Sequence, residues 1–133
     1  MKALLALSLV CTTLTVVPSL GAAEGARGAL RVDVGEWSVV PAFGLVSAGT
    51  GRIVARNLGE EPHELVLVRT PRFAQRFPLQ GDHAILVPVA SSGVIAPGGT
   101  VSFVVSVKRG SYALVDNLPW HYWKGTTVAF AVR

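Results

Sequence analysis

Apolar and polar side chains alternate along most of the chain from residue 30 onwards. In residues 101–107, apolar side chains at the odd positions alternate with serines at 102 and 106. A period of two residues is typical of a β-strand with one buried face. The same pattern predicts about seven short strands, at residues 30–40, 52–57, 63–70, 84–89, 101–107, 112–115 and 127–132.

Two of these runs also indicate where the strand lies in its sheet. In residues 63–70, leucines at 65 and 67 face one side and valines at 66 and 68 face the other. A strand that is apolar on both faces is expected at the centre of a sheet. Residues 84–89 contain Pro88, which has no N–H for the hydrogen-bond ladder, so this run is expected near an edge.

Turn-forming residues separate the runs, and no long amphipathic helix is expected. Gly35 interrupts the first run and is interpreted as a bulge in one strand that ends at Pro41. Residues 48–51 and 96–99 carry turn signals. Residues 72–77 have a weak helical pattern, which prolines at 71 and 78 limit to one or two turns. Together these features predict an all-β sandwich, antiparallel or mixed, with Greek-key connections.

Residues 1–23 have the pattern of a secretory signal peptide. Lys2 supplies a positive start, an apolar stretch follows, and Gly21-Ala22-Ala23 is a small-residue cleavage site. The alternative, a membrane anchor, requires a longer apolar segment than this one, which Pro18 ends. We therefore expect one exported domain at residues 24–133, periplasmic or secreted, with no membrane span in the mature chain.

Export has consequences for the chemistry of the domain. Cleavage removes Cys11, the only cysteine, so the mature domain has no thiol and no disulfide. Its stability must come from an apolar core. The net charge of +4 falls by one with the loss of Lys2. Such a charge favours ordinary solubility over a dedicated acidic partner, and an exported location argues against a nucleic-acid partner.

Two segments carry the candidate chemistry, and both contain histidine. The first is Asn57-Leu58-Gly59-Glu60-Glu61-Pro62-His63-Glu64-Leu65-Val66, a loop that leads into a strand. The second is Tyr112-Ala113-Leu114-Val115-Asp116-Asn117-Leu118-Pro119-Trp120-His121-Tyr122-Trp123-Lys124-Gly125-Thr126, in which a strand ends in a tight loop.

These segments resemble the two metal-binding regions of cupredoxins, the small β-sandwiches that bind copper. The resemblance implies a cupredoxin-like Greek-key sandwich in which His63 and His121 occupy the two histidine ligand positions. Asp116 stands at the cysteine position, five residues before His121, and Thr126 stands at the methionine position, five residues after it. Trp120 replaces a glycine beside the ligand histidine, so this loop is expected either to change its conformation or to shield the site.

The resemblance therefore implies a metal site formed by His63, Asp116 and His121, and its chemistry differs from that of a blue copper site. A blue site requires a cysteine thiolate with two imidazoles. A carboxylate with two imidazoles is a harder ligand set, which suits Cu(II) in a tetragonal geometry or Zn(II) in a tetrahedral one with a water. We expect copper, with zinc as an alternative, and no role in fast electron transfer.

A metal-free reading of the same residues stays open. Asp116 would then cap the loop by accepting backbone hydrogen bonds in an Asx-turn, and His63 and His121 would be ordinary histidines near the surface. His83 follows Asp82 in a separate loop and is either a further ligand or solvated. Trp120, Tyr122 and Trp123 form an aromatic rim beside His121, which either docks a protein partner or caps the core.

Three functions are compatible with these features. In none of them is this domain expected to be an enzyme by itself. The first is an exported protein that binds and handles copper. The second is a metal-free interaction module that uses the aromatic rim. The third, a subunit of a copper oxidase or reductase, fits worst because such enzymes combine several copper centres, which three histidines cannot supply.

Overall fold

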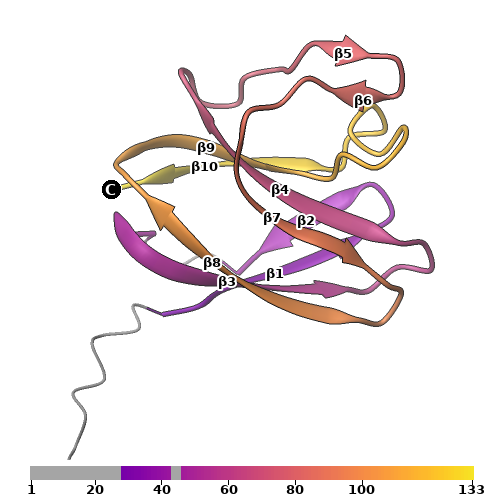
Figure 1. Cartoon of the computed structure of the whole chain (residues 1–133), viewed down its shortest axis with the longest axis horizontal. Coiled ribbons are helices and arrows are strands. Elements are labelled where there is room, and N and C mark those ends of the chain that lie inside the picture. Colours follow the sequence, from indigo (N-terminus) through magenta and orange to yellow (C-terminus); the bar gives the residue numbers. More distant parts are fainter. Residues whose placement is uncertain (1–27, 43–45) are drawn as a thin grey trace, which may run out of the picture.

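The computed structural model describes residues 28–42 and 46–133 (Figure 1). The expected signal peptide, residues 1–23, and the first residues of the expected domain, 24–27, lie outside these described residues. No helix within the described ranges is long and apolar enough to cross a membrane.

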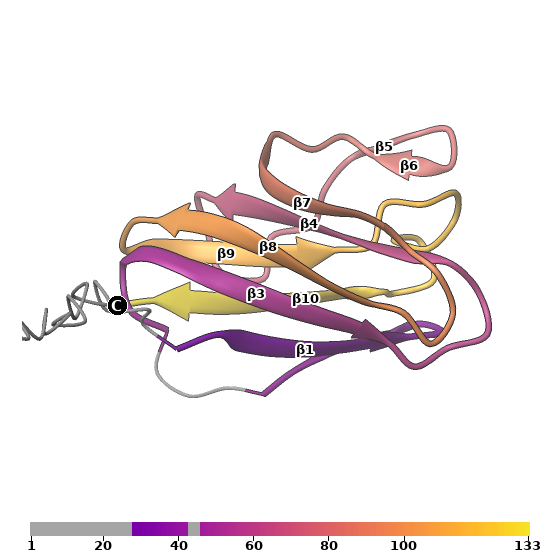
Figure 2. The same cartoon turned by 60° about the horizontal axis from the view of Figure 1, so that its bottom comes forward.

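Eight strands form two facing sheets (Figures 1 and 2). The first sheet has the order β2-β1-β3-β8. The second has the order β10-β9-β4-β7, and β5 and β6 pair separately as a small hairpin. Strands β1 and β3 are parallel, and the other pairs are antiparallel. The bounds are β1 Leu30–Gly35, β2 Ser38–Pro41, β3 Gly49–Asn57, β4 His63–Thr70, β5 Leu79–Gln80, β6 His83–Ala84, β7 Pro88–Ile95, β8 Thr100–Val107, β9 Gly110–Val115 and β10 Thr127–Val132.

The core lies between the sheets, and alternation decides which side chains enter it. On β4, Leu65 and Leu67 belong to the main core, whereas Val66 and Val68 pack in a second apolar cluster with Val115. β4 has a neighbour on each side, β9 and β7. The prediction of a central strand with two apolar faces is confirmed. The predicted all-β sandwich is confirmed as well.

The first expected strand, residues 30–40, is wrong as a single strand. It is a hairpin of β1 and β2 in which Gly35 pairs with Ser38, so Glu36 and Trp37 form the turn and Gly35 marks no bulge. Trp37 has a φ of 63°, in the left-handed region. The pattern hid this turn because hairpin turns with positive φ usually contain glycine or asparagine.

Three other segments also differ from the prediction. Residues 49–51, expected in a turn, begin β3 and pair with the end of β8. The run 84–89 is divided between β6 and β7, and β7 extends through Ser91-Ser92-Gly93 to Ile95. β7 is an edge strand, as Pro88 predicted. Residues 72–77 contain a turn and no helix. These differences, together with the short strand β5 that was not predicted, raise the strand number from about seven to ten among the described residues.

Candidate metal centre

Strand pairing brings two of the expected ligands to the same end of the sandwich. His63 is the first residue of β4, and Asp116 follows directly after the last residue of β9. β4 and β9 are antiparallel neighbours, with Val66 opposite Val115. The start of one strand therefore lies beside the end of the other. His121 follows in the loop between β9 and β10.

Backbone hydrogen bonds hold this loop, residues 116–126, in a compact form. The Asp116 N–H donates to the Thr126 carbonyl at 3.0 Å, and the Thr126 N–H donates to the His121 carbonyl at 3.1 Å. The Asn117 side chain ties the loop to the β5–β6 hairpin, because it accepts from the Ala84 N–H at 2.7 Å and donates to the Ala84 carbonyl at 3.1 Å. The loop thus returns His121 towards Asp116.

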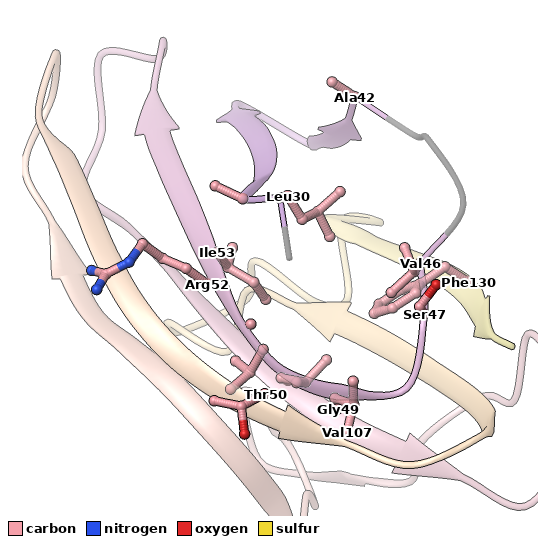
Figure 3. Close-up of a pocket in the computed structure, with 15 residues that line it drawn as sticks. Leu30, Ala42, Val46, Ser47, Gly49, Thr50, Arg52, Ile53, Val107 and Phe130 are labelled. Carbon is pink, nitrogen blue, oxygen red and sulfur yellow. The ribbon is translucent and has the colours of Figure 1, made fainter. Parts of the chain in front are cut away.

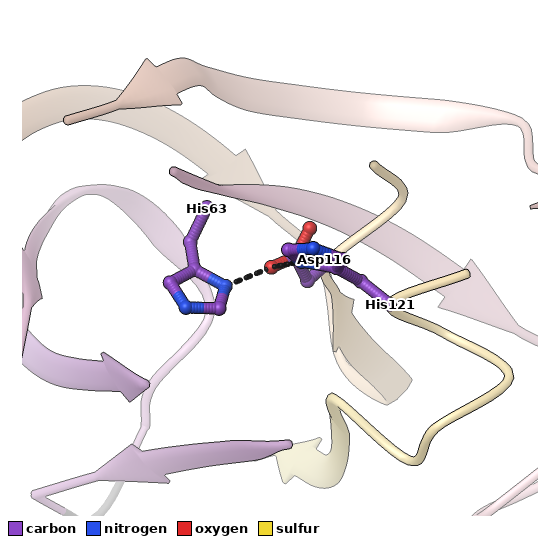
Figure 4. Close-up of side chains that lie close together, drawn as sticks. All are labelled: His63, Asp116 and His121. Carbon is purple, nitrogen blue, oxygen red and sulfur yellow. Dashed lines mark hydrogen bonds and ion pairs between the residues drawn. The ribbon is translucent and has the colours of Figure 1, made fainter. Parts of the chain in front are cut away.

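The three expected ligand residues converge (Figure 4). Oδ2 of Asp116 lies 2.5 Å from Nδ1 of His63 and 2.8 Å from Nδ1 of His121. One ligand atom from each residue lies within 4.8 Å of the others. Asp116 and His63 are fully buried, and His121 is nearly so. Two imidazoles and one carboxylate therefore meet at a single point beneath the surface.

Asp116 uses its two oxygens differently. Oδ1 accepts a hydrogen bond from the Leu118 N–H at 3.1 Å, which is an Asx-turn, while Oδ2 faces both imidazoles. The loop-capping contact that the sequence offered as one interpretation is thus present, and it leaves Oδ2 facing the two imidazoles.

The distances from Asp116 to the two imidazoles are close to those between ligands of one metal, whereas the three ligand atoms together lie within 4.8 Å and must draw together around an ion. Atoms bonded to one metal at about 2.0 Å lie about 2.8 Å apart at a right angle and about 3.3 Å apart in a tetrahedron. The Asp116–His121 distance equals the first value and the Asp116–His63 distance is slightly shorter. Thr126, at the methionine position, is fully buried, and its hydroxyl has no hydrogen-bond partner among the described residues. Such an orphaned group fits a missing water or ion.

The loop before His63 is fixed by a buried asparagine. Asn57 donates from Nδ2 to the carbonyls of Glu61 at 2.8 Å and Ile95 at 2.9 Å. Its Oδ1 accepts from the Gly59 N–H at 2.8 Å. Asn57 therefore holds the turn that delivers His63, which gives a physical role to an asparagine that the sequence marked only by resemblance.

Sequence reasoning missed two residues beside the imidazoles, Glu36 and Trp37. Oε1 of Glu36 lies 3.4 Å from Nε2 of His63. The Trp37 ring meets the His121 ring edge-on, with centroids 5.4 Å apart and an angle of 86°. No spacing motif links residues 36 and 63, and the turn that presents them was not predicted. The only signal was the break in alternation after Gly35.

The pKa values of two carboxylates near the site are shifted in opposite directions. The Glu61 backbone N–H, together with those of Glu36 and Glu60, lowers the pKa of Glu36 from 4.5 to about 2. Burial, followed by the charge of Asp116, raises the pKa of Glu64. The site is therefore flanked by one firmly ionised carboxylate and one that ionises reluctantly.

His83 is not brought to the cluster. Its side chain is 46% exposed and forms an ion pair with Asp82, its neighbour in sequence. The solvated interpretation of this loop fits the geometry. Glu61 lies nearer, with Oε2 3.6 Å from Nε2 of His121, but its side chain is 55% exposed.

The expected aromatic rim divides into exposed and packed members. Trp120 is 53% exposed and Trp123 is 66% exposed, and their rings meet edge-on. The Tyr122 hydroxyl instead accepts a hydrogen bond from the Phe77 N–H at 2.8 Å, and the two rings pack together. Trp120 has a φ of 67°, so it adopts the left-handed conformation that a glycine takes easily.

A separate cavity of about 520 Å³ opens at the other end of the sandwich (Figure 3). It is lined mainly by core side chains, including Leu30, Ile53, Val107 and Phe130. Arg52 is the one charged residue among those lining it. This hollow brings together no reactive groups of the described chain, so the histidine end remains the candidate site.

Comparison with known proteins identifies the fold. No protein-family model and no curated protein sequence matches the chain. Solved structures match well, and three of them represent two kinds of protein. Reduced auracyanin from the photosynthetic bacterium Roseiflexus castenholzii has a TM-score of 0.62 and 20% identity, with 82% of this chain and 99% of that chain covered.

The other two structures give the same result. Auracyanin A, described as a "blue" copper protein from Chloroflexus aurantiacus, has a TM-score of 0.56 and 20% identity, covering 80% of this chain and all of that one. Rusticyanin from Thiobacillus ferrooxidans has a TM-score of 0.56 and 18% identity, covering 79% and 77%. The chain therefore has the cupredoxin fold. At such identities the similarity establishes the fold alone.

Proposed function

We propose that this protein is an exported copper-binding protein that holds Cu(II) between Nδ1 of His63, Oδ2 of Asp116 and Nδ1 of His121. One observation carries the proposal: the three ligand atoms converge within 4.8 Å at a buried point. The bound ion would supply a stable divalent charge at this end of the sandwich. Zn(II) is the alternative ion for the same ligand set.

The ligand set favours binding and handling of copper over electron transfer. The neighbour auracyanin A is a "blue" copper protein. A blue centre requires a thiolate, and Asp116 stands where the resemblance places that cysteine. A carboxylate and two imidazoles favour Cu(II) over Cu(I), so cycling between the two states would be slow.

The test is titration of the purified protein with Cu(II), followed by calorimetry and EPR spectroscopy. We expect one strong site with nitrogen hyperfine structure, a tetragonal spectrum and no intense blue absorption. H63A and H121A should each abolish strong binding. H83A removes the remaining histidine, which lies outside the cluster, and should bind copper as the original protein does. Equal binding by H121A and H83A would disprove the proposed site.

A second function is favoured by the exposed pair Trp120 and Trp123. Aromatic side chains that remain exposed beside a site are typical of binding hot spots. In this alternative the protein is a metal-free interaction module, and the His63–Asp116–His121 cluster only stabilises the loop. A partner that binds the metal-free protein would favour this function if W120S/W123S abolishes its binding and H121A retains it.

Export and domain extent belong to the same proposal. The signal-peptide pattern of residues 1–23 supports a periplasmic or secreted domain at 24–133. Mass spectrometry of the protein recovered from the periplasm or medium of a bacterial host should give a chain that begins at Glu24. Recovery of the full-length chain from the cytoplasm would contradict this part of the proposal.

A further inference from the structure

The β1–β2 turn reaches both imidazoles with adjacent side chains. Glu36 meets His63, and Trp37 meets His121. We propose that this two-residue turn positions the imidazole pair, so that each ring presents Nδ1 to a divalent cation held with Asp116. The inference rests on the proposed copper function for its consequence, but the contacts of Glu36 and Trp37 can be tested without a metal.

Glu36 determines which nitrogen of His63 is free to bind. Its Oε1 accepts hydrogen bonds from the backbone N–H groups of Glu60 at 2.7 Å and Glu61 at 2.9 Å, which fix the carboxylate. The same oxygen lies 3.4 Å from Nε2 of His63. A carboxylate only accepts, so a hydrogen bond at this contact requires the hydrogen on Nε2, and it leaves Nδ1 as the nitrogen that faces Asp116. Carboxylates behind ligand histidines orient them in this way in metal sites.

The carboxylate of Glu36 fits against the backbone because residue 59 is a glycine and has no side chain. A Cβ added at Gly59 would lie 2.2 Å from Oε1 of Glu36 and 2.5 Å from Oε2. Any side chain at residue 59 would therefore displace the carboxylate from His63. The glycine is explained by the close approach of Glu36, since its own φ is not in the left-handed region.

Trp37 holds the second imidazole. Its ring lies edge-on to His121, and Nζ of Lys124 lies 3.7 Å from the centroid of the indole. Lys124 and His121 belong to the same loop between β9 and β10. The indole is therefore contacted from two points of that loop, which restricts rotation of the His121 ring.

The backbone at Trp37 is costly, and the side-chain contacts account for its presence. A non-glycine residue in the left-handed region is strained, because its Cβ lies too close to the backbone. Glycine or asparagine would occupy this hairpin position with less strain. A tryptophan there, in contact with a site histidine and a lysine, is the pattern in which local strain accompanies a positioning role.

The turn also joins the two sheets at the site. β1 and β2 belong to the sheet β2-β1-β3-β8, whereas β4, which begins with His63, and β9, which Asp116 follows, belong to the other sheet. The positioning turn therefore contacts the two imidazoles from the sheet opposite to β4 and β9. Movement of a ligand loop relative to its own sheet would be resisted by contacts from the opposite one.

Nitrogen-15 NMR of the metal-free protein tests the contact of Glu36. We expect Nε2 of His63 to carry a slowly exchanging hydrogen, and E36A to accelerate its exchange at least roughly tenfold. E60A, which removes a neighbouring carboxylate without an imidazole contact, should leave the exchange rate unchanged. A hydrogen-free Nε2 on His63 in the original protein would overturn this half of the proposal.

Side-chain relaxation of His121 tests the contact of Trp37. W37G removes the indole and also relieves the left-handed strain, so the fold should be retained. We expect greater motion of the His121 ring in W37G and no change in W120G. The W120G control removes an exposed indole at another left-handed position, next to His121 in sequence. W37F should restore part of the restriction. An equally rigid His121 ring in W37G would overturn this half.

Titration with Cu(II) and Zn(II) then measures the consequence. E36A and W37G should each weaken binding by about 10- to 100-fold, the usual effect of removing a group that orients a ligand. E60A and W120G should bind as the original protein does. Unchanged affinity in both E36A and W37G would overturn positioning. If the original protein binds neither ion, the proposed copper function fails, while the NMR results still decide whether the turn positions the rings.

Discussion

At the residue scale, Asp116 combines two tasks that are usually separate. One oxygen caps the backbone of its own loop, and the other faces two buried imidazoles. A fully buried carboxylate is costly unless it is paired and hydrogen-bonded. Here Leu118, His63 and His121 together satisfy it. The residue at the expected cysteine position therefore holds the loop together through its own hydrogen bonds.

This arrangement predicts a large difference between two His–Asp pairs. D116A leaves two buried imidazoles without their carboxylate and should reduce the free energy of unfolding by about 3–5 kcal/mol in metal-free protein. D82A breaks the Asp82–His83 pair, which is largely exposed, and should cost about 0–1 kcal/mol. Urea denaturation at neutral pH measures both. Similar losses in the two variants would contradict the structural role given to Asp116.

Glu36 provides a pH-dependent prediction at the same scale. Its pKa in the folded protein is about 2, below the ordinary value of 4.5. Ionised Glu36 therefore stabilises the fold above about pH 4.5, and this contribution disappears as the pH falls from about 4.5 to about 2. E36Q should lose less stability than the original protein over this range in urea denaturation. E60Q is the control and should lose as much as the original protein.

At the element scale, regular strands were predictable, whereas unusual turns and strand ends were not. β4, β8, β9 and β10 follow the alternation of their side chains, because one face of each packs into the core. The turn at Glu36 and Trp37 escaped prediction because neither residue is typical of such turns. The second half of β7 was missed because Ser91-Ser92-Gly93 has a turn-like composition, while pairing with β4 overrides it.

The candidate site was predictable only where its segments resemble those of cupredoxins. The resemblance assigned Asp116 and His121 to one loop and His63 to the end of another, and the structure brings these three residues together. Glu36 lies 27 residues before His63 and reaches it from the opposite sheet. Such a contact depends on how the sheets pack, which no local pattern encodes.

The loop between β9 and β10 gives a prediction about its ligand geometry. If it keeps the frame of a cupredoxin copper loop, D116C should place a thiolate beside two imidazoles. Copper added to D116C should then produce the intense blue absorption of a thiolate site. T126M combined with D116C would supply the axial ligand and should alter the spectrum. T126C without D116C is the matched control for a thiol elsewhere in the loop, and strong blue colour in T126C alone would contradict the assignment.

At the scale of the whole molecule, the site joins segments that are distant in the chain. The β1–β2 turn, the loop before β4 and the loop after β9 meet at one end of the sandwich, while the apolar cavity opens at the other. Both sheets contribute to the first of these ends. A ligand bound there contacts groups whose relative positions depend on the complete fold, so binding and folding should be thermodynamically coupled.

Copper should therefore stabilise the whole protein in a pH-dependent manner. Free Cu(II) at 100 times its dissociation constant adds about 2.7 kcal/mol, which corresponds to a rise in Tm of roughly 10 °C for a domain of this size. Metal binding requires deprotonated ligand atoms, so protons compete with the cation for the imidazole nitrogens of His63 and His121. The copper-induced rise in Tm should shrink steadily as the pH is lowered from 8 to 5. Thermal unfolding with and without Cu(II) measures this, with H83A expected to behave as the original protein and H121A to show no rise. A rise of constant size across that pH range would mean that copper binds without competing with protons for imidazole nitrogens, and therefore elsewhere on the protein.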